Sequence, residues 1–266
     1  MVCSVLVLRL NVHVANAYVQ EDGPVEDIGA FALAVGAVLA FVAFRRAGRE
    51  PARDRAAQVR RLSYLGLALF LLVAFGEEIS WGQRILGLGT PDALRSANAQ
   101  GEMNLHNLHG DANGQNASDV LFKAVWVTLG VIVPVAAAVS ARARATLERF
   151  VPVLPLWLAL LFVGQQLLWK PATADWRHEP AAWHAVYRAQ IAGDDFRVTT
   201  QRQAHEHRVN APAGLSEVME TNVEVLLGVA GLMTLLGAGS GPARRPSPRR
   251  SGGRTARAGR SAAHAA

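Results

Sequence analysis

Charged residues are scarce in this chain of 266 residues, where Asp, Glu, Lys and Arg together make up 18% and hydrophobic residues 51%. A soluble domain usually carries about 25% charged residues. The charges gather in short segments between long uncharged runs, which is typical of membrane proteins rather than of soluble cores. The sequence therefore predicts an all-α fold, a polytopic transmembrane helix bundle of about five spans with polar outer loops.

Cysteine and the common catalytic motifs are also missing. Cys3 is the single cysteine, which excludes an internal disulfide and any CxxC zinc or redox motif. The chain has no HExxH, no GxSxG and no P-loop sequence. No standard motif therefore names a reaction.

A net charge of +6 could suggest nucleic acid as a partner, but the distribution of the charge argues against it. Much of the excess lies in residues 238–266, whose Gly, Ser, Pro and Arg composition cannot form a core. We expect this segment to be a disordered basic cytoplasmic tail that touches anionic lipids. Its arginines face no acidic residue: they are Arg244, Arg245, Arg249, Arg250, Arg254, Arg257 and Arg260.

Apolar runs predict the spans within a transmembrane domain that covers residues 28–237, after an external segment at 1–27. The helical spacing of apolar residues from Ile79 to Leu88 predicts that the second helix continues past Glu77 and Glu78, and Pro134 predicts a kink in the third. The expected spans are 28–44, 62–80, 120–140, 151–169 and 217–236.

Small residues recur along the first span at four-residue spacing, as Ala32, Gly36 and Ala40. This spacing allows another helix to approach closely. It could equally follow from the high Ala and Gly content of the chain.

Arginines in the connecting segments predict the orientation. Seven of them lie between residues 45 and 61, more follow the third span, and the tail is basic. An odd number of spans places all three segments on one side, which we expect to be the cytoplasmic side of a bacterial inner membrane. The N-terminus, the 77–119 loop and the 170–216 loop then face outward.

Polar side chains on three spans fall at a similar depth. At 1.5 Å per helical residue, Glu77 lies about 22 Å above the inner boundary, Gln165 about 21 Å, Glu224 about 18 Å and Glu220 about 24 Å. Ionised groups in hydrocarbon normally face a bundle interior or a wet cavity. We infer a carboxylate-lined cavity open to the outside, while a structural ion-pair cluster is the alternative.

The first outer loop carries carboxylate and imidazole groups that could bind a divalent metal or catalyse proton transfer. If residues 100–109 are helical, Glu102, His106 and His109 share one face. With Glu78 they form a speculative metal-ligand set. Asn104 and Asn107 could equally serve helix caps and loop packing.

Two motifs in this region resemble those of a family of uncharacterised bacterial multi-pass membrane proteins. They read GEEISWGQR at 76–84 and QGExNLHN at 100–107, and the element EDGPVE at 21–26 adds to the likeness. The likeness covers residues 20–110, and beyond them only the hydrophobic pattern. The resemblance implies a membrane location and singles out the two motifs, but it implies no reaction.

Glu77 and Glu78 are adjacent, so on a helix they point about 100° apart and cannot both face one ligand. Glu77 shares a face with Trp81 and Arg84, which favours a packing and ion-pairing role. Gly82 leaves space beside Glu78, which favours Glu78 as the carboxylate that meets Glu102 or His106.

Three functions compete for these residues. The first is a membrane-embedded enzyme acting at the outer leaflet on a lipid or lipid-linked substrate, and the others are an ion-coupled transporter and a non-catalytic module that binds partners. For the enzyme, the expected catalytic residues are Glu77, Glu78, Glu102 and His106, and the expected substrate-binding residues are Arg84, Trp81, Gln83 and Asn104.

The topology is testable with reporter fusions. Reporters placed after Glu50 and after Ser240 should both read as cytoplasmic and one after Ala112 as external, because the basic segments stay inside. Alkaline phosphatase and fluorescent protein activities measure the two sides. Opposite readings at residues 50 and 240 would contradict the five-span arrangement.

Overall fold

The computed structural model describes residues 24–49, 54–98, 101–106, 108, 116–172 and 211–238. The predicted external segment up to residue 23 and the basic tail from residue 239 lie outside the described residues. Within the described ranges the chain is helical and contains no strand.

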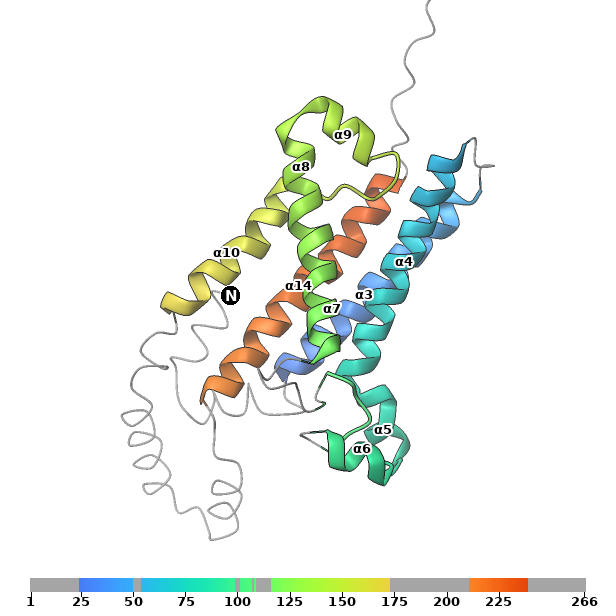
Figure 1. The fold of residues 1–266 in the computed structure, drawn as a ribbon. Coiled ribbons are helices and arrows are strands. Elements are labelled where there is room, and N and C mark those ends of the chain that lie inside the picture. Colours follow the sequence, from blue (N-terminus) through green and yellow to red (C-terminus); the bar gives the residue numbers. More distant parts are fainter. Residues whose placement is uncertain are drawn as a thin grey trace, which may run out of the picture.

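The long helices form a bundle, and short helices join them at its two ends (Figure 1). The elements are α3 (Pro24–Ala47), α4 (Arg55–Glu78), the 3₁₀ turn η1 (Ser80–Gly82), α5 (Gln83–Leu86), α6 (Asp92–Ala97), α7 (Ala117–Val127), the π turn η2 (Thr128–Ile132), α8 (Val133–Val139), α9 (Ala141–Leu147), α10 (Leu156–Ala172) and α14 (Ala211–Ala238).

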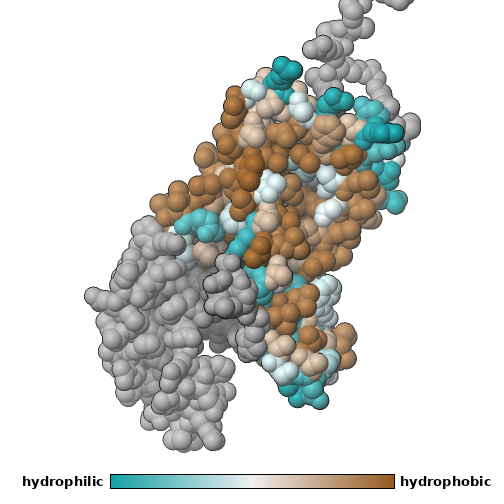
Figure 2. All heavy atoms as spheres, viewed as in Figure 1, coloured by the Kyte–Doolittle hydropathy of each residue, from teal (hydrophilic) through white to brown (hydrophobic). Residues whose placement is uncertain are grey.

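Four helical segments are long and apolar enough to cross a membrane: Pro24–Ala47, Arg55–Glu78, Ala117–Val139 and Val218–Ala238. The apolar part of α10, Leu156–Trp169, is shorter. Large apolar side chains such as Phe31 and Leu121 are exposed on the outside of the bundle, and hydrophobic atoms dominate its surface in Figure 2. This is the surface expected of a multi-pass protein in lipid, and it confirms the predicted fold class.

The helix bounds differ from the predicted spans because capping residues decide where the helices begin. α3 starts at Pro24, a residue suited to the first helical position, with Glu26 and Asp27 in the first turn. The Asp54 side chain accepts a hydrogen bond from the Ala57 N–H at 2.8 Å and so starts α4 seven residues before the predicted span. α10 begins after Pro155 rather than at residue 151.

The third long helix is irregular near Pro134, where a kink was predicted, but the irregular turn lies just before the proline. Residues Thr128–Ile132 form a π turn, and the Val133 N–H bonds to the Thr128 carbonyl. Pro134 has no N–H to donate, so the regular ladder cannot continue through it. Gly130 in this turn lets the Phe162 ring of α10 approach closely, because an added Cβ would lie 2.8 Å from that ring.

The closest helix pair is α3 with α14, and small residues make the approach possible. A Cβ added at Gly228 would lie 2.6 Å from the Ala32 carbonyl oxygen, and one at Gly36 would lie 2.9 Å from the Gly228 Cα. The prediction that Ala32 and Gly36 allow close helix contact is therefore confirmed. Backbone contact of this kind stabilises helix pairs in lipid, where no hydrophobic effect drives them together.

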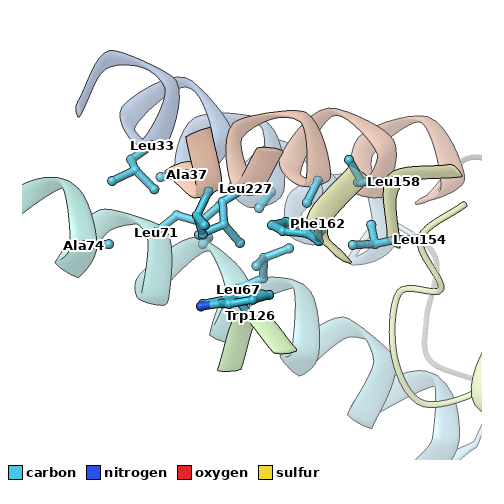
Figure 3. Packing of buried hydrophobic residues seen from close by; sticks show 14 residues of the cluster. Leu33, Ala37, Leu67, Leu71, Ala74, Trp126, Leu154, Leu158, Phe162 and Leu227 are labelled. Carbon is cyan, nitrogen blue, oxygen red and sulfur yellow. The ribbon is translucent and has the colours of Figure 1, made fainter. Parts of the chain in front are cut away.

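The core lies where α3, α4, α10 and α14 face one another around the end of α7. Leu33, Leu71 and Leu227 are buried together there, and the rings of Trp126 and Phe162 stack with centroids 5.5 Å apart (Figure 3). These contacts hold α10 and α7 against the α3–α14 pair.

Basic segments of the chain meet at one end of the bundle. The Arg60 guanidinium donates to the Gly237 carbonyl at 3.4 Å, which places the start of α4 beside the end of α14. Arg149, after α9, lies 3.8 Å from Asp54, before α4. The helix α9 lies at this end, and α5 and α6 lie at the other (Figure 1).

Replacing Gly228 by Ala should destabilise the folded protein by about 1–3 kcal/mol, because the new methyl group meets backbone atoms of α3 that cannot rotate away. Gly66→Ala is the matched control, since a Cβ there meets nothing within 4 Å. It should leave stability unchanged or raise it slightly. Thermal unfolding in detergent measures both variants, and equal melting temperatures would refute the tight α3–α14 contact.

Candidate functional site

The helix α4 ends at the paired glutamates, and the prediction that it continues to Leu88 is wrong. Ser80, Trp81 and Gly82 follow with φ angles of 46°, 55° and 74°. Left-handed backbone at Ser80 and Trp81 costs free energy that other contacts must offset. The Trp81 ring folds back over Gly76, where an added Cβ would lie 2.8 Å from the ring. The chain thus reverses direction at the end of the bundle.

Residues 101–106 of the predicted outer loop are not helical either, so the predicted shared face of Glu102, His106 and His109 does not form among the described residues. Residues Gly101–His106 are bends and turns, and Asn98 and Leu108 form an isolated antiparallel bridge. The Asn98 side chain accepts from the Glu102 N–H at 3.2 Å and donates to Asn104 Oδ1 at 2.7 Å. Gly101, with φ of 71°, suits the turn.

Glu77 anchors this loop to the bundle. Glu77 is 8% exposed, and its carboxylate accepts hydrogen bonds from the backbone N–H groups of Leu105 and His106. The Trp81 indole N–H donates to the same carboxylate at 2.8 Å. The expected packing role of Glu77 beside Trp81 therefore matches the contacts, although Trp81 belongs to a turn and not to the helix.

Glu102 bonds to the turn after α4 and to its own loop. Its Oε2 accepts from the Ser80 hydroxyl and from Asn104 Nδ2, the latter at 3.1 Å. Gln83 accepts from the Met103 N–H at 2.8 Å and donates to the Thr90 hydroxyl at 2.6 Å. Three residues predicted to act on a substrate, Glu102, Gln83 and Asn104, thus bond the two motifs to each other.

His106 lies beside the glutamates, as its place in the loop suggested. Its Nδ1 is 3.7 Å from Glu77 Oε2. Burial by itself lowers the pKa of His106, but the Glu77 carboxylate beside it and the charges of Glu78 and Glu220 outweigh burial. The pKa of His106 is therefore raised above its ordinary value of 6.5.

Glu78 meets the helix α14. Its carboxyl group is hydrogen-bonded to that of Glu224 on α14, and the charges of His106 and Glu220 act on it. Glu224 is buried against α3, where a Cβ on Gly29 would collide with its carboxylate. A hydrogen bond between two carboxyl groups requires a proton on one of them. We expected Glu78 to meet Glu102 or His106. The charge of His106 does act on Glu78, and Glu78 also contacts Glu224.

The predicted divalent metal has no complete ligand set in the described part of the chain. No three His, Cys, Asp or Glu side chains in that part are arranged to hold a metal ion. Glu102 bonds to Ser80 instead of turning toward Glu78, and His109 lies outside the described residues, as does the side chain of Arg84. The described donors do not fit a metal centre.

Glu220 and Glu224 were predicted to line a carboxylate cavity, but their position beside Glu78 was not predicted, because it depends on how α14 packs against α3 and α4. Gln165, predicted at the same depth, is buried on α10, and its side-chain amide has no hydrogen-bond partner within the described ranges. Ser80 and Asn98 carried no signal beyond their places in or near the motifs.

No family model, curated protein or solved structure matches this chain. The resemblance to an uncharacterised bacterial membrane family therefore stays a prediction.

Replacing Glu77 by Gln should lower the pKa of His106, because the neutral amide no longer favours the imidazolium. In the native protein the raised pKa stabilises the fold below the unfolded value of 6.5, and this contribution is lost as pH rises through the higher folded value. NMR titration of labelled histidine measures the pKa, with Asp92→Asn as a control at an exposed site. An unchanged His106 pKa in Glu77→Gln would contradict the assigned contact.

Proposed function

We propose that this protein is an integral membrane enzyme that uses His106 and Glu78 for acid–base chemistry on a lipid or lipid-linked substrate. The observation that carries the proposal is the position of His106 at one end of the bundle, 3.7 Å from Glu77 Oε2 and within reach of the charges of Glu78 and Glu220. An imidazole and a carboxyl pair can exchange protons at nearly neutral pH, which general acid–base catalysis needs.

Each group has a distinct part in this chemistry. Glu77 is a positioning residue: it holds the loop through the His106 N–H and raises the pKa of the His106 imidazole. The Glu78–Glu224 pair holds one proton that can pass to a leaving oxygen. His106, once deprotonated, can take a proton from an attacking water or hydroxyl group. The reaction class is transfer or hydrolysis at an oxygen ester.

The substrate class follows from the position of the site. Glu78 and Glu224 belong to helices that are long and apolar enough to cross a membrane. A group reacting there must reach the boundary between lipid and water, which a membrane lipid does without leaving the bilayer. We propose that the basic end of the bundle faces the cytoplasm of a bacterium and that the site faces outward, with the tail arginines against anionic lipids.

A second candidate function is proton-coupled transport, and the Glu78–Glu224 contact favours it. Intramembrane carboxyl groups that share a proton across two helices occur along ion pathways. A transporter would load and release that proton on opposite sides of the membrane.

One experiment separates the two functions. Lipid extracts of cells producing the protein, Glu78→Gln or His106→Gln are compared by mass spectrometry, with Glu148→Gln at the basic end as the matched control. The enzyme should change the amount of a lipid or lipid-linked species, and each site variant should reduce that activity by about 100-fold or more. The control should behave like the native protein.

Other outcomes overturn the enzyme. Unchanged lipid profiles, together with a proton flux into vesicles that Glu78→Gln abolishes, would establish the transporter instead. If neither lipid change nor flux occurs with correctly folded protein, a non-catalytic, partner-binding module is the better account. Gel filtration of each variant checks that it is folded.

A further inference from the structure

The segment after α4 folds into a small lobe at the end of the bundle, made of residues 80–98, 101–106 and 108, which we call the terminal lobe (Figure 1). Several of its polar side chains point inward, whereas Asp92 and Arg95 on α6 are exposed. Ser80 is 0% and Asn104 1% exposed, and Asn98 and Thr90 are also buried. These residues bond to one another and to backbone groups of the lobe.

The apolar side chains of the terminal lobe point outward. Ile85 is 81% exposed, and Trp81, Leu86, Leu88 and Leu105 are also largely exposed. A lobe in water would bury such residues and expose its amides and hydroxyls. An exposed apolar patch over a polar interior instead indicates contact with lipid or with another protein.

The depth of the lobe favours lipid. From Leu62, where the apolar run of α4 starts, to Glu78, where the helix ends, the rise is about 24 Å. The hydrocarbon layer is about 30 Å thick. Counted from Leu62, the end of α4 therefore lies near the edge of the hydrocarbon layer, and the lobe begins at the membrane interface.

Apolar side chains are also exposed on the helix that leads into the lobe. Leu69, Leu72 and Val73 are exposed in the second half of α4, and Figure 2 shows hydrophobic atoms on both the bundle and the lobe. The lobe therefore shares exposed apolar side chains with the spanning helix, whereas Asp92 and Arg95 on α6 form an exposed polar part of it.

The backbone of the lobe meets the requirement that lipid imposes. Irregular backbone at membrane depth is tolerated only where its polar groups are satisfied within the protein. The N–H groups of Glu102, Met103, Leu105 and His106 all donate to side chains of Asn98, Gln83 and Glu77. In water, solvent could accept hydrogen bonds from these N–H groups, but in lipid only the protein can.

We propose that the terminal lobe is embedded in the interfacial region of the bilayer, with Trp81, Ile85, Leu86 and Leu88 against the lipid. Trp81 suits this place, since tryptophan gathers at membrane interfaces. The embedded lobe carries Trp81 beside Glu77, and so brings lipid next to the acid–base groups. The proposal concerns location and stands whether or not the site is catalytic.

Site-directed fluorescence tests the location in the full-length chain with Cys3→Ser. Cysteines introduced by Ile85→Cys, Asp92→Cys and Leu69→Cys are labelled with an environment-sensitive dye in phosphatidylcholine–phosphatidylglycerol vesicles. A nitroxide-labelled phosphatidylcholine should quench the dye at residues 85 and 69 at least about twofold more than at residue 92, whereas aqueous iodide should quench residue 92 most.

Two results would overturn the proposal. A dye at residue 85 that responds to iodide as residue 92 does would place the lobe in water. A dye at residue 85 shielded from both quenchers would show that protein, in place of lipid, covers the patch. Leu86→Cys serves as the second site if Ile85→Cys fails to fold.

Discussion

Irregular backbone at the edge of a membrane must find its hydrogen bonds inside the protein, and Glu77 meets that constraint here. Its buried carboxylate accepts from two loop N–H groups and from the Trp81 indole. The left-handed turn after α4, the path of the loop and the position of His106 all depend on these bonds. Water cannot replace them in lipid, so a single carboxylate fixes the geometry of the whole end of the bundle.

Adjacent glutamates acquire different tasks because of their helical phase. Glu77 points to the loop, whereas Glu78 points to α14 and Glu224. The second contact depends on close helix packing elsewhere. Glu224 fits against α3 because Gly29 has no side chain, and the Gly36–Gly228 approach holds the two helices close enough. Glycines along α3 therefore support both the fold and the contact between Glu78 and Glu224.

The two motifs consist largely of residues that bind one another. Ser80, Gln83, Glu102 and Asn104 link the turn after α4 to the loop. None of these four side chains is among the groups that we propose exchange protons, which are Glu78, Glu224 and His106. A sequence motif rich in polar residues can thus be mostly a scaffold that holds a smaller chemical site.

The sequence by itself determined that the chain spans a membrane and roughly where its helices lie, and it singled out Glu77, Glu78 and His106 as candidate site residues. Hydropathy and helical phase are local properties, and they can be read from neighbouring residues. Only the tertiary structure decided that α4 stops at Glu78, that Glu102 bonds to Ser80, and that Glu224 meets Glu78. Local spacing even favoured a longer helix, because the apolar residues from Ile79 to Leu88 have helical periodicity. The turn forms because contacts with residues 20 or more positions away outweigh that local preference.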